Sequence, residues 1–182
     1  MRSISILTVA LCGLCACASA PKIDYYTLGM ESSGRTETAV NISVERLRTT
    51  EALGRSQIMV LASPTRIDYY ATSYWAGSVG EVVQQKLAAE FGPPVAGRKT
   101  LVVSGKVLAC EQVDGPGGAE ARVILEIAVR VAEVPRYQPP LLEKAYASRR
   151  TVSGSNPESV VEELSRCVEE IAAKIADDLS AL

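Results

Sequence analysis

Near its N-terminus the chain carries Leu14-Cys15-Ala16-Cys17, whose residue types and spacing suit acylation of a thiol. A branched aliphatic residue three positions before a cysteine, with a small residue directly before it, is the pattern of a lipobox. Leu14, Ala16 and Cys17 fit this pattern, whereas the two earlier cysteines are each directly preceded by leucine. The sequence therefore predicts cleavage between Ala16 and Cys17, followed by covalent attachment of diacylglycerol and an N-acyl chain to Cys17.

The segment before the lipobox has the length of a signal peptide rather than of a membrane span. Arg2 supplies a positive charge, and residues 4–14 form an apolar run well short of the ~20 residues that cross a bilayer. Several acyl chains on Cys17 would hold the protein stably at a membrane. The alternative is an ordinary secretory signal cut near residues 18–20, which would discard Cys17.

These features divide the chain into three parts. We expect a lipoprotein signal peptide at residues 1–16, a lipidated tether at 17–22 and a single domain at 23–182. Ala18 follows the acylated cysteine, where an aspartate would retain the protein at the inner membrane under the enteric sorting rule. The sequence therefore predicts an outer-membrane anchor, with the domain facing the periplasm.

Composition argues against several function classes. The chain has no histidine, which removes the commonest general base and the commonest metal ligand. Its formal net charge is −2 and it contains no basic run, so we expect no nucleic-acid partner. No acidic residues cluster in a pocket-like context. We therefore expect no enzymatic activity, no catalytic residue, no metal and no cofactor apart from the covalent lipid.

Two cysteines, Cys110 and Cys167, remain in the domain, and the predicted compartment permits disulfides. Helical phase points Cys167 into the core. Strand parity places Cys110 on the side opposite Val103 and Val107, unless a bulge intervenes. Because disulfide geometry is demanding, a Cys110–Cys167 bond stays open but is not favoured over two separate thiols.

Aromatic residues gather in the first half of the domain, and Tyr74 and Trp75 are the candidates for a functional role among them. Their ordinary role would be packing in the core or at a sheet edge. Exposed aromatic side chains are also enriched at protein interfaces. Contact with a partner through Tyr74 and Trp75 is therefore the second interpretation.

Two segments have the pattern of amphipathic helices. Ser78 and Glu81 form a capping box before an apolar stripe that ends at Gly92-Pro93-Pro94. Asn156 and Pro157 have the N-cap and first-turn pattern of a second helix that runs nearly to the C-terminus.

Alternating or β-branched runs predict the strands, at residues 23–28, 40–45, 57–62, 66–70, 101–109, 121–131 and 144–152. Residues 111–119 and 135–140 are rich in glycine or proline and are predicted loops. Each helix and most strands have one apolar face. We therefore predict an α+β two-layer sandwich: a mostly antiparallel or mixed sheet with two amphipathic helices on one face.

The order of these motifs resembles the ABC-type transport auxiliary lipoprotein family. A lipobox is followed by a Tyr-Tyr-Thr-Leu strand at residues 25–28, and Gln57–Val60 is joined through a proline turn to Arg66–Tyr70. In this resemblance Trp75-Ala76 opens the first helix. The likeness covers most of the chain after the lipobox.

The resemblance implies a non-catalytic subunit, with Cys17 as its one transferable functional residue. Its partners would be an MCE-domain periplasmic protein and, through it, an ABC permease and an ATPase. Such systems move phospholipids or other hydrophobic molecules across the cell envelope. Family analogy also leaves open a homo-oligomer around a tubular partner. The alternative is a structural or assembly lipoprotein, of the lipopolysaccharide-export plug or secretin pilotin type.

Overall fold

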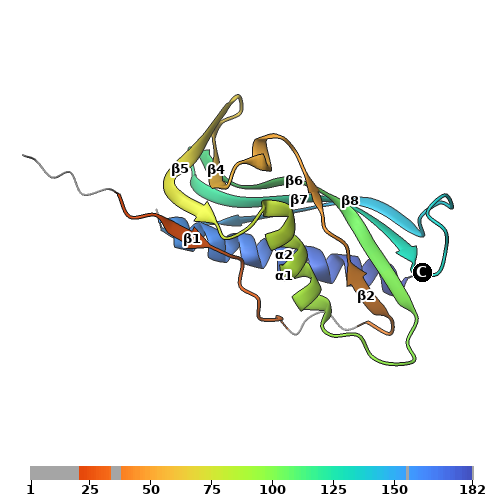
Figure 1. Ribbon diagram of the computed structural model, residues 1–182. Helices are drawn as coiled ribbons and strands as arrows, with labels where there is room; N and C mark the ends of the chain where they lie inside the picture. Colours follow the sequence, from red (N-terminus) through yellow and green to blue (C-terminus); the bar gives the residue numbers. More distant parts are fainter. Residues whose placement is uncertain (1–20, 34–37, 155, 182) are drawn as a thin grey trace, which may run out of the picture.

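The chain forms one mixed sheet with two helices on one face in the computed structural model, which describes residues 21–33, 38–154 and 156–181 (Figure 1). The helices are α1 (Val79–Phe91) and α2 (Pro157–Ser180). This arrangement confirms the predicted α+β sandwich. The strands of the described residues are β1 (Asp24–Tyr26), β2 (Asn41–Val44), β3 (Arg48–Thr49), β4 (Gln57–Ser63), β5 (Arg66–Trp75), β6 (Thr100–Gly115), β7 (Gly118–Val131) and β8 (Leu142–Thr151).

Strand β6 is the centre of the sheet, whose main path is β1-β5-β4-β6-β7-β8. One edge of β6 pairs with three strands, all parallel to it: β2 and β3 on its first half and β4 on its second half. Its other edge pairs with β7 in an antiparallel hairpin, and β8 returns antiparallel to β7. Strand β1 lies parallel to β5 at the far edge.

Both helices begin where the capping signals predict. The Ser78 side chain accepts a hydrogen bond from the Glu81 backbone N–H at 3.3 Å, and α1 ends at Gly92, which adopts a φ of 72°. The Asn156 side chain likewise accepts from the Ser159 N–H at 2.8 Å at the start of α2. Neither helix is long and apolar enough to span a membrane, within the residues that the structure describes.

The core lies between the helices and the sheet. Strand β7 is the clearest example of how the strands supply this core. Side chains alternate between the two faces of a strand, and every second residue from Ala121 to Val129 is buried on the helix side. They pack against the apolar stripe of α2, in which Leu164, Ile171 and Ile175 are fully buried. Each such side chain contributes about 1.5–3 kcal/mol to folding through its burial.

The first helix begins later than the family resemblance implies. Trp75 is the last residue of β5 rather than the opening of a helix, and α1 starts at Val79. The prediction failed because β5 extends to 75 by pairing with β1, and this pairing joins Tyr26 to Trp75 in register.

The predicted loop at residues 111–119 is also much shorter in the structure. Strand β6 continues to Gly115 and β7 begins at Gly118, so Pro116 and Gly117 alone form the turn. The backbone pairing of the two long strands extends through the glycine-rich segment, which composition alone marks as irregular.

A β-bulge in β6 corrects the predicted orientation of Cys110. Val107 pairs with Leu125, whereas Ala109 pairs with the preceding residue Ile124, so β6 holds one extra residue. Side-chain parity changes at this point, and Cys110 lies with the core residues. The prediction that Cys110 faces away from Val103 and Val107 is therefore wrong.

The connection between β2 and β4 contains two elements that the sequence patterns did not indicate. These are the two-residue strand β3 and a 3-10 turn, η1 (Ala52–Gly54). The turn is held by Tyr69, whose hydroxyl donates to the Ala52 carbonyl oxygen at 2.8 Å. Leu53 is buried beneath it.

Candidate functional site

The predicted acylation site, Ala16 and Cys17, lies outside the described residues. The described chain begins at Pro21 and enters the fold through β1, which pairs in register with the end of β5. Just before this strand, the exposed Lys22 forms an ion pair with Asp24 at 2.6 Å. The predicted tether therefore leads directly into an edge strand of the sheet.

After β1 the chain is fastened to both helices. Leu28 is fully buried, and the Gly29 N–H donates to the Ser165 Oγ of α2 at 3.0 Å. The Ser33 N–H and hydroxyl donate to the Glu90 carboxylate of α1, the hydroxyl at 2.6 Å. The Lys86 Nζ donates to the Glu31 carbonyl oxygen at 2.8 Å. The N-terminal segment is thus an integral part of the domain.

Lys86 and Glu90 form a buried ion pair at 2.6 Å, with 1% and 0% of their side chains exposed. Lys86 also contacts Glu169 of α2 at 2.9 Å. Burial by itself would raise the pKa of Glu90. Hydrogen bonds from Lys86 and Ser33 outweigh this effect, so the pKa of Glu90 lies below its usual value. The pair joins α1, α2 and the N-terminal segment, and we assign it a structural role.

The two aromatic candidates have different surroundings. Trp75 is 3% exposed and belongs to the core, so its position fits the packing interpretation. Tyr74 is half-buried, with its ring centroid 6.0 Å from that of Tyr25, which is 69% exposed. The exposed aromatic surface at this edge therefore belongs mainly to Tyr25.

Cys110 and Cys167 are both buried and free in the structure. The Cys167 thiol lies 3.7 Å from the Ala121 carbonyl oxygen. Burial raises the pKa of both thiols, that of Cys167 to about 11. Neither thiol is therefore activated as a nucleophile at neutral pH.

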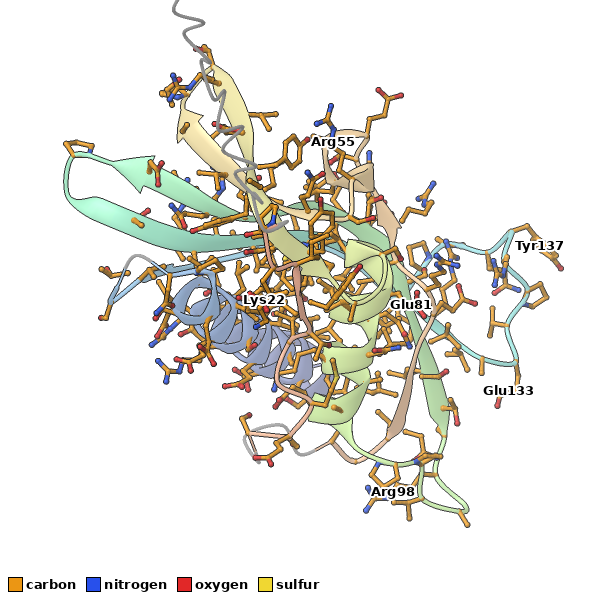
Figure 2. The ribbon with its side chains drawn as sticks, turned by 60° about the vertical axis from the view of Figure 1, so that its left-hand side comes forward. Lys22, Arg55, Glu81, Arg98, Glu133 and Tyr137 are labelled. Atoms are coloured by element: carbon orange, nitrogen blue, oxygen red, sulfur yellow. The ribbon has the colours of Figure 1, made fainter. Side chains whose placement is uncertain are left out.

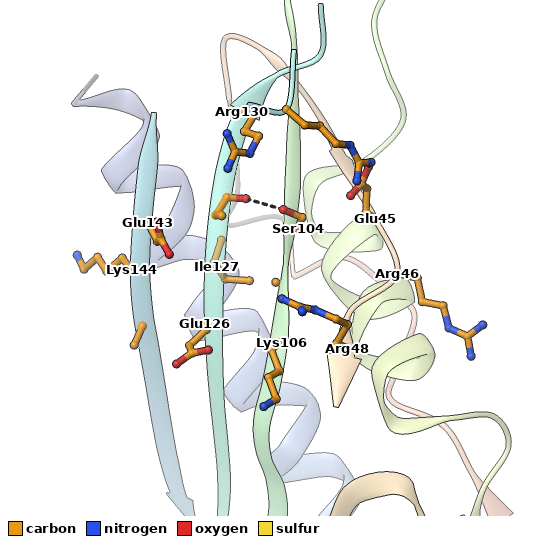
Figure 3. Close-up of a pocket in the computed structure, with 14 residues that line it drawn as sticks. Glu45, Arg46, Arg48, Ser104, Lys106, Glu126, Ile127, Arg130, Glu143 and Lys144 are labelled. Carbon is orange, nitrogen blue, oxygen red and sulfur yellow. Dashed lines mark hydrogen bonds and ion pairs between the residues drawn. The ribbon is translucent and has the colours of Figure 1, made fainter. Parts of the chain in front are cut away.

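The face of the sheet opposite the helices carries a groove of about 800 Å³ over β6, β7 and β8 (Figure 3). One side of it is formed by residues 45–48, which lead from β2 into β3. The other boundary is the connection between β7 and β8, whose Tyr137 projects from the molecule and is 87% exposed (Figure 2). The groove was not predicted from the sequence.

Positive charge predominates in this groove. Five cationic side chains line it, namely Arg46, Arg48, Lys106, Arg130 and Arg136. Lys144 also borders the groove, but its ammonium group pairs with Asp178 of α2 on the other face of the sheet. The lining carboxylates are Glu45, Glu126 and Glu143. Five cations and three carboxylates give a formal charge of +2, although the whole chain has a net charge of −2. The groove can therefore attract an anionic group.

The polar groups in the groove can form hydrogen bonds and ion pairs with a ligand. The Ser104 hydroxyl donates to the Ala128 carbonyl oxygen at 3.4 Å, within the floor of the groove. Across the described residues, no cluster of three or more His, Cys, Asp or Glu side chains has an arrangement that could hold a metal ion. The geometry of the groove thus presents cations to a ligand.

The fold and the sequence together match a known family. Residues 26–176 match the family described as the ABC-type transport auxiliary lipoprotein component. The chain belongs to this family. Its members are auxiliary lipoproteins of ABC-type transport and associate with the cell envelope, as the sequence pattern predicted. Comparison with curated proteins finds no match.

Solved structures share the fold of this auxiliary lipoprotein. A crystal structure of an uncharacterized protein has a TM-score of 0.67 at 12% identity, and the match covers 87% of this chain and 99% of the other. A protein from Xanthomonas campestris has a TM-score of 0.65 at 13% identity, with 88% and 99% covered. At these identities the likeness establishes the fold alone.

Proposed function

We propose that this chain is a non-catalytic subunit of an MCE/ABC-type system that moves phospholipids or other hydrophobic molecules across the cell envelope. Acyl chains on Cys17 anchor it to the outer membrane, and residues 23–182 form a single domain that faces the periplasm. Residues 1–16 are the signal peptide, and 17–22 are the lipidated tether. The observation that carries the proposal is the family match over residues 26–176, which follows the lipobox at residues 14–17.

The proposed function of the lipid anchor is to keep the domain at the outer membrane, where it meets its periplasmic partner. Confinement to a membrane turns docking into a local event and raises the effective concentration at the docking site. The contacts of the segment after the tether support such a role. Ser33 and Glu31 are bonded to Glu90 and Lys86 of α1, and the Gly29 N–H is bonded to Ser165 of α2. A pull on the anchor is therefore transmitted to the whole domain.

The partner would be an MCE-domain periplasmic protein, and through it the permease and the ATPase. Crosslinking in intact cells, followed by purification of the lipoprotein and mass spectrometry, tests this directly. We expect the MCE-domain protein among the crosslinked products, and permease and ATPase genes beside the gene for this chain. Recovery of a β-barrel or secretin subunit in its place would contradict the proposal.

Localisation gives an independent test of the anchor. Separation of membranes by density should place the wild-type protein in the outer-membrane fraction. The variant Cys17→Ser should lose its acyl chains and the outer-membrane location that depends on them. An inner-membrane location of the wild-type protein would refute the outer-membrane part of the proposal and leave the transport partner to be tested separately.

A further inference from the structure

We infer that the groove on the open face of the sheet is a docking site for an acidic, extended polypeptide segment of a partner protein. Arg48 and Lys106 are the central cations of this site. The inference concerns the domain itself, and it stands whether or not the chain is lipid-anchored.

Arg48 and Lys106 are direct cross-strand neighbours. They pair in register between the parallel strands β3 and β6, and both line the groove (Figure 3). Like charges placed directly opposite each other on a sheet are destabilising. On its other side Lys106 has Glu126 of β7 as its register partner, so this carboxylate offsets part of its charge. No salt bridge is formed by either side chain within the part of the chain that the structure describes. An anion placed beside Arg48 and Lys106 would neutralise the positive charge that Glu126 does not offset.

The other groove cations are already engaged by groups of the protein. Arg136 contacts Glu45 at 2.5 Å, and Lys144 reaches to the helix side of the sheet, where it contacts Asp178 of α2 at 2.7 Å. Arg46 donates to the Ser78 hydroxyl oxygen at 3.3 Å, and Arg130 donates to the Gln138 carbonyl oxygen. Arg48 and Lys106 are therefore the pair with most capacity for a ligand.

Residues 45–48, which form the wall of the groove that carries Arg48, pack closely on α1. Gly80 of α1 packs so closely on this wall that a Cβ atom there would lie 2.2 Å from the Leu47 carbonyl oxygen. The Gln84 side-chain amide donates to the Val44 carbonyl oxygen at 3.0 Å. The backbone next to Arg48 is thus held in place before any ligand binds, which lowers the cost of ordering the site.

The shape and lining of the groove favour a polypeptide over a lipid. Its floor between the charged residues consists mainly of small residues, Ser104, Gly105, Ala128 and Ala145. The large apolar residue in the lining, Ile127, is 1% exposed and packs in the core, so the groove offers little apolar surface for acyl chains. Such a floor admits an extended main chain, with acidic side chains reaching the cations. Arg136 and the exposed Tyr137 lie at its margin, and these residue types are enriched at protein interfaces.

Fluorescence titration of the mature lipoprotein in detergent tests the inference. The probe is a labelled peptide that alternates Glu with Ser, compared with one that alternates Lys with Ser. We expect the acidic peptide alone to bind. The double variant Arg48→Glu/Lys106→Glu should weaken its binding about tenfold or more, because two charge-assisted contacts become repulsive.

A matched control separates the groove from general charge. The double variant Arg66→Glu/Lys99→Glu changes two exposed cations outside the groove by the same total charge, and we expect it to bind like the wild type. The milder variant Arg48→Gln/Lys106→Gln should also weaken binding. If thermal unfolding shows that Arg48→Glu/Lys106→Glu is misfolded, the Gln variant is used in its place.

Three results would overturn the inference. One is the absence of binding to the acidic peptide, and another is an equal loss of binding in the groove variant and the control variant. The third comes from a separate titration with glycerol phosphate, which represents a phospholipid headgroup. If glycerol phosphate binds through Arg48 and Lys106 while the peptide does not, the site recognises a phosphate headgroup rather than a polypeptide.

Discussion

At the scale of single residues, the contribution of each ion pair to the stability of the fold depends on how deeply the pair is buried. Lys86 and Glu90 are almost completely buried, whereas 83% of the Arg136 side chain in the pair with Glu45 is exposed. Water and salt weaken an exposed pair, but a buried charge that loses its partner remains desolvated. The two pairs should therefore respond very differently to the removal of their cation.

We predict that Lys86→Met lowers the free energy of unfolding by about 3–5 kcal/mol, because Glu90 is left as a buried charge. Arg136→Ala should lower it by less than about 1 kcal/mol. Urea unfolding of both variants provides the measurement. Adding Glu90→Leu to Lys86→Met should restore part of the loss. Equal effects of the two single variants would show that the buried pair has no special structural role.

The two core cysteines should be inert in the folded protein. Both are buried, and their raised pKa values keep the thiols protonated at neutral pH. We predict that a thiol reagent labels neither Cys110 nor Cys167 in the native mature protein, and labels both after denaturation. Rapid labelling of either residue before unfolding would contradict this description of the core.

At the scale of elements, the contact between α1 and the β2–β3 connection is unusually close. Gly80 allows this contact, because a Cβ atom there would clash with the Leu47 backbone. In an open helix, Gly→Ala normally stabilises by about 1 kcal/mol. At position 80, however, the absence of a Cβ atom in glycine allows residues 45–48, which include Arg48, to pack directly on the helix.

We predict that Gly80→Ala destabilises the domain by about 1–3 kcal/mol, since the added methyl group must displace backbone atoms. Gly54→Ala is the matched control, because a Cβ atom there would meet nothing within 4 Å. Thermal unfolding of the two variants provides the comparison. A stabilising Gly80→Ala would mean that the helix and the wall are not in contact in solution.

Local signals were sufficient for the helices and most strands. Ser78 and Asn156 mark the starts of α1 and α2, and the alternation of residues 121–131 indicates β7. The same reasoning gave wrong predictions where the structure depends on pairing between segments that are distant in the sequence. Trp75 belongs to a strand because β1 pairs with β5, and the bulge in β6 reverses the orientation of Cys110.

The groove and the buried ion pair could not be predicted from the sequence. Arg48 and Lys106 are 58 residues apart in the sequence and meet only because the two-residue strand β3 pairs in parallel with β6. Lys86 and Glu90 have the spacing of an ordinary solvent-exposed pair on a helix, so nothing in the pattern indicates their burial.

At the scale of the whole molecule, carboxylates with lowered pKa values couple stability to pH. Burial would raise the pKa values of Glu90 and Glu170, but hydrogen bonds from Lys86, Ser33, Ser148 and Arg150 hold them below the usual value of 4.5. Folding therefore favours their ionised form. This contribution to stability is present above the usual pKa and is lost as the pH falls through the lower folded-state pKa.

We predict that the free energy of unfolding changes little between pH 7 and about pH 5.5 and then declines in acid. Glu90→Gln should make this decline shallower, because the neutral side chain no longer takes up a proton on unfolding. Glu162→Gln, at an exposed position of α2, should leave the decline unchanged. Urea unfolding across the pH range provides the measurement, and a steeper decline in Glu90→Gln would contradict the argument.

The whole account depends on where the mature protein begins and on what its first residue carries. Mass spectrometry of the N-terminal peptide from membrane-extracted protein measures both directly. We predict a peptide that begins at Cys17 and has the added mass of a diacylglycerol and an N-acyl chain. An unmodified peptide that begins downstream of Cys17 would contradict the central claim that this domain is tethered by lipid.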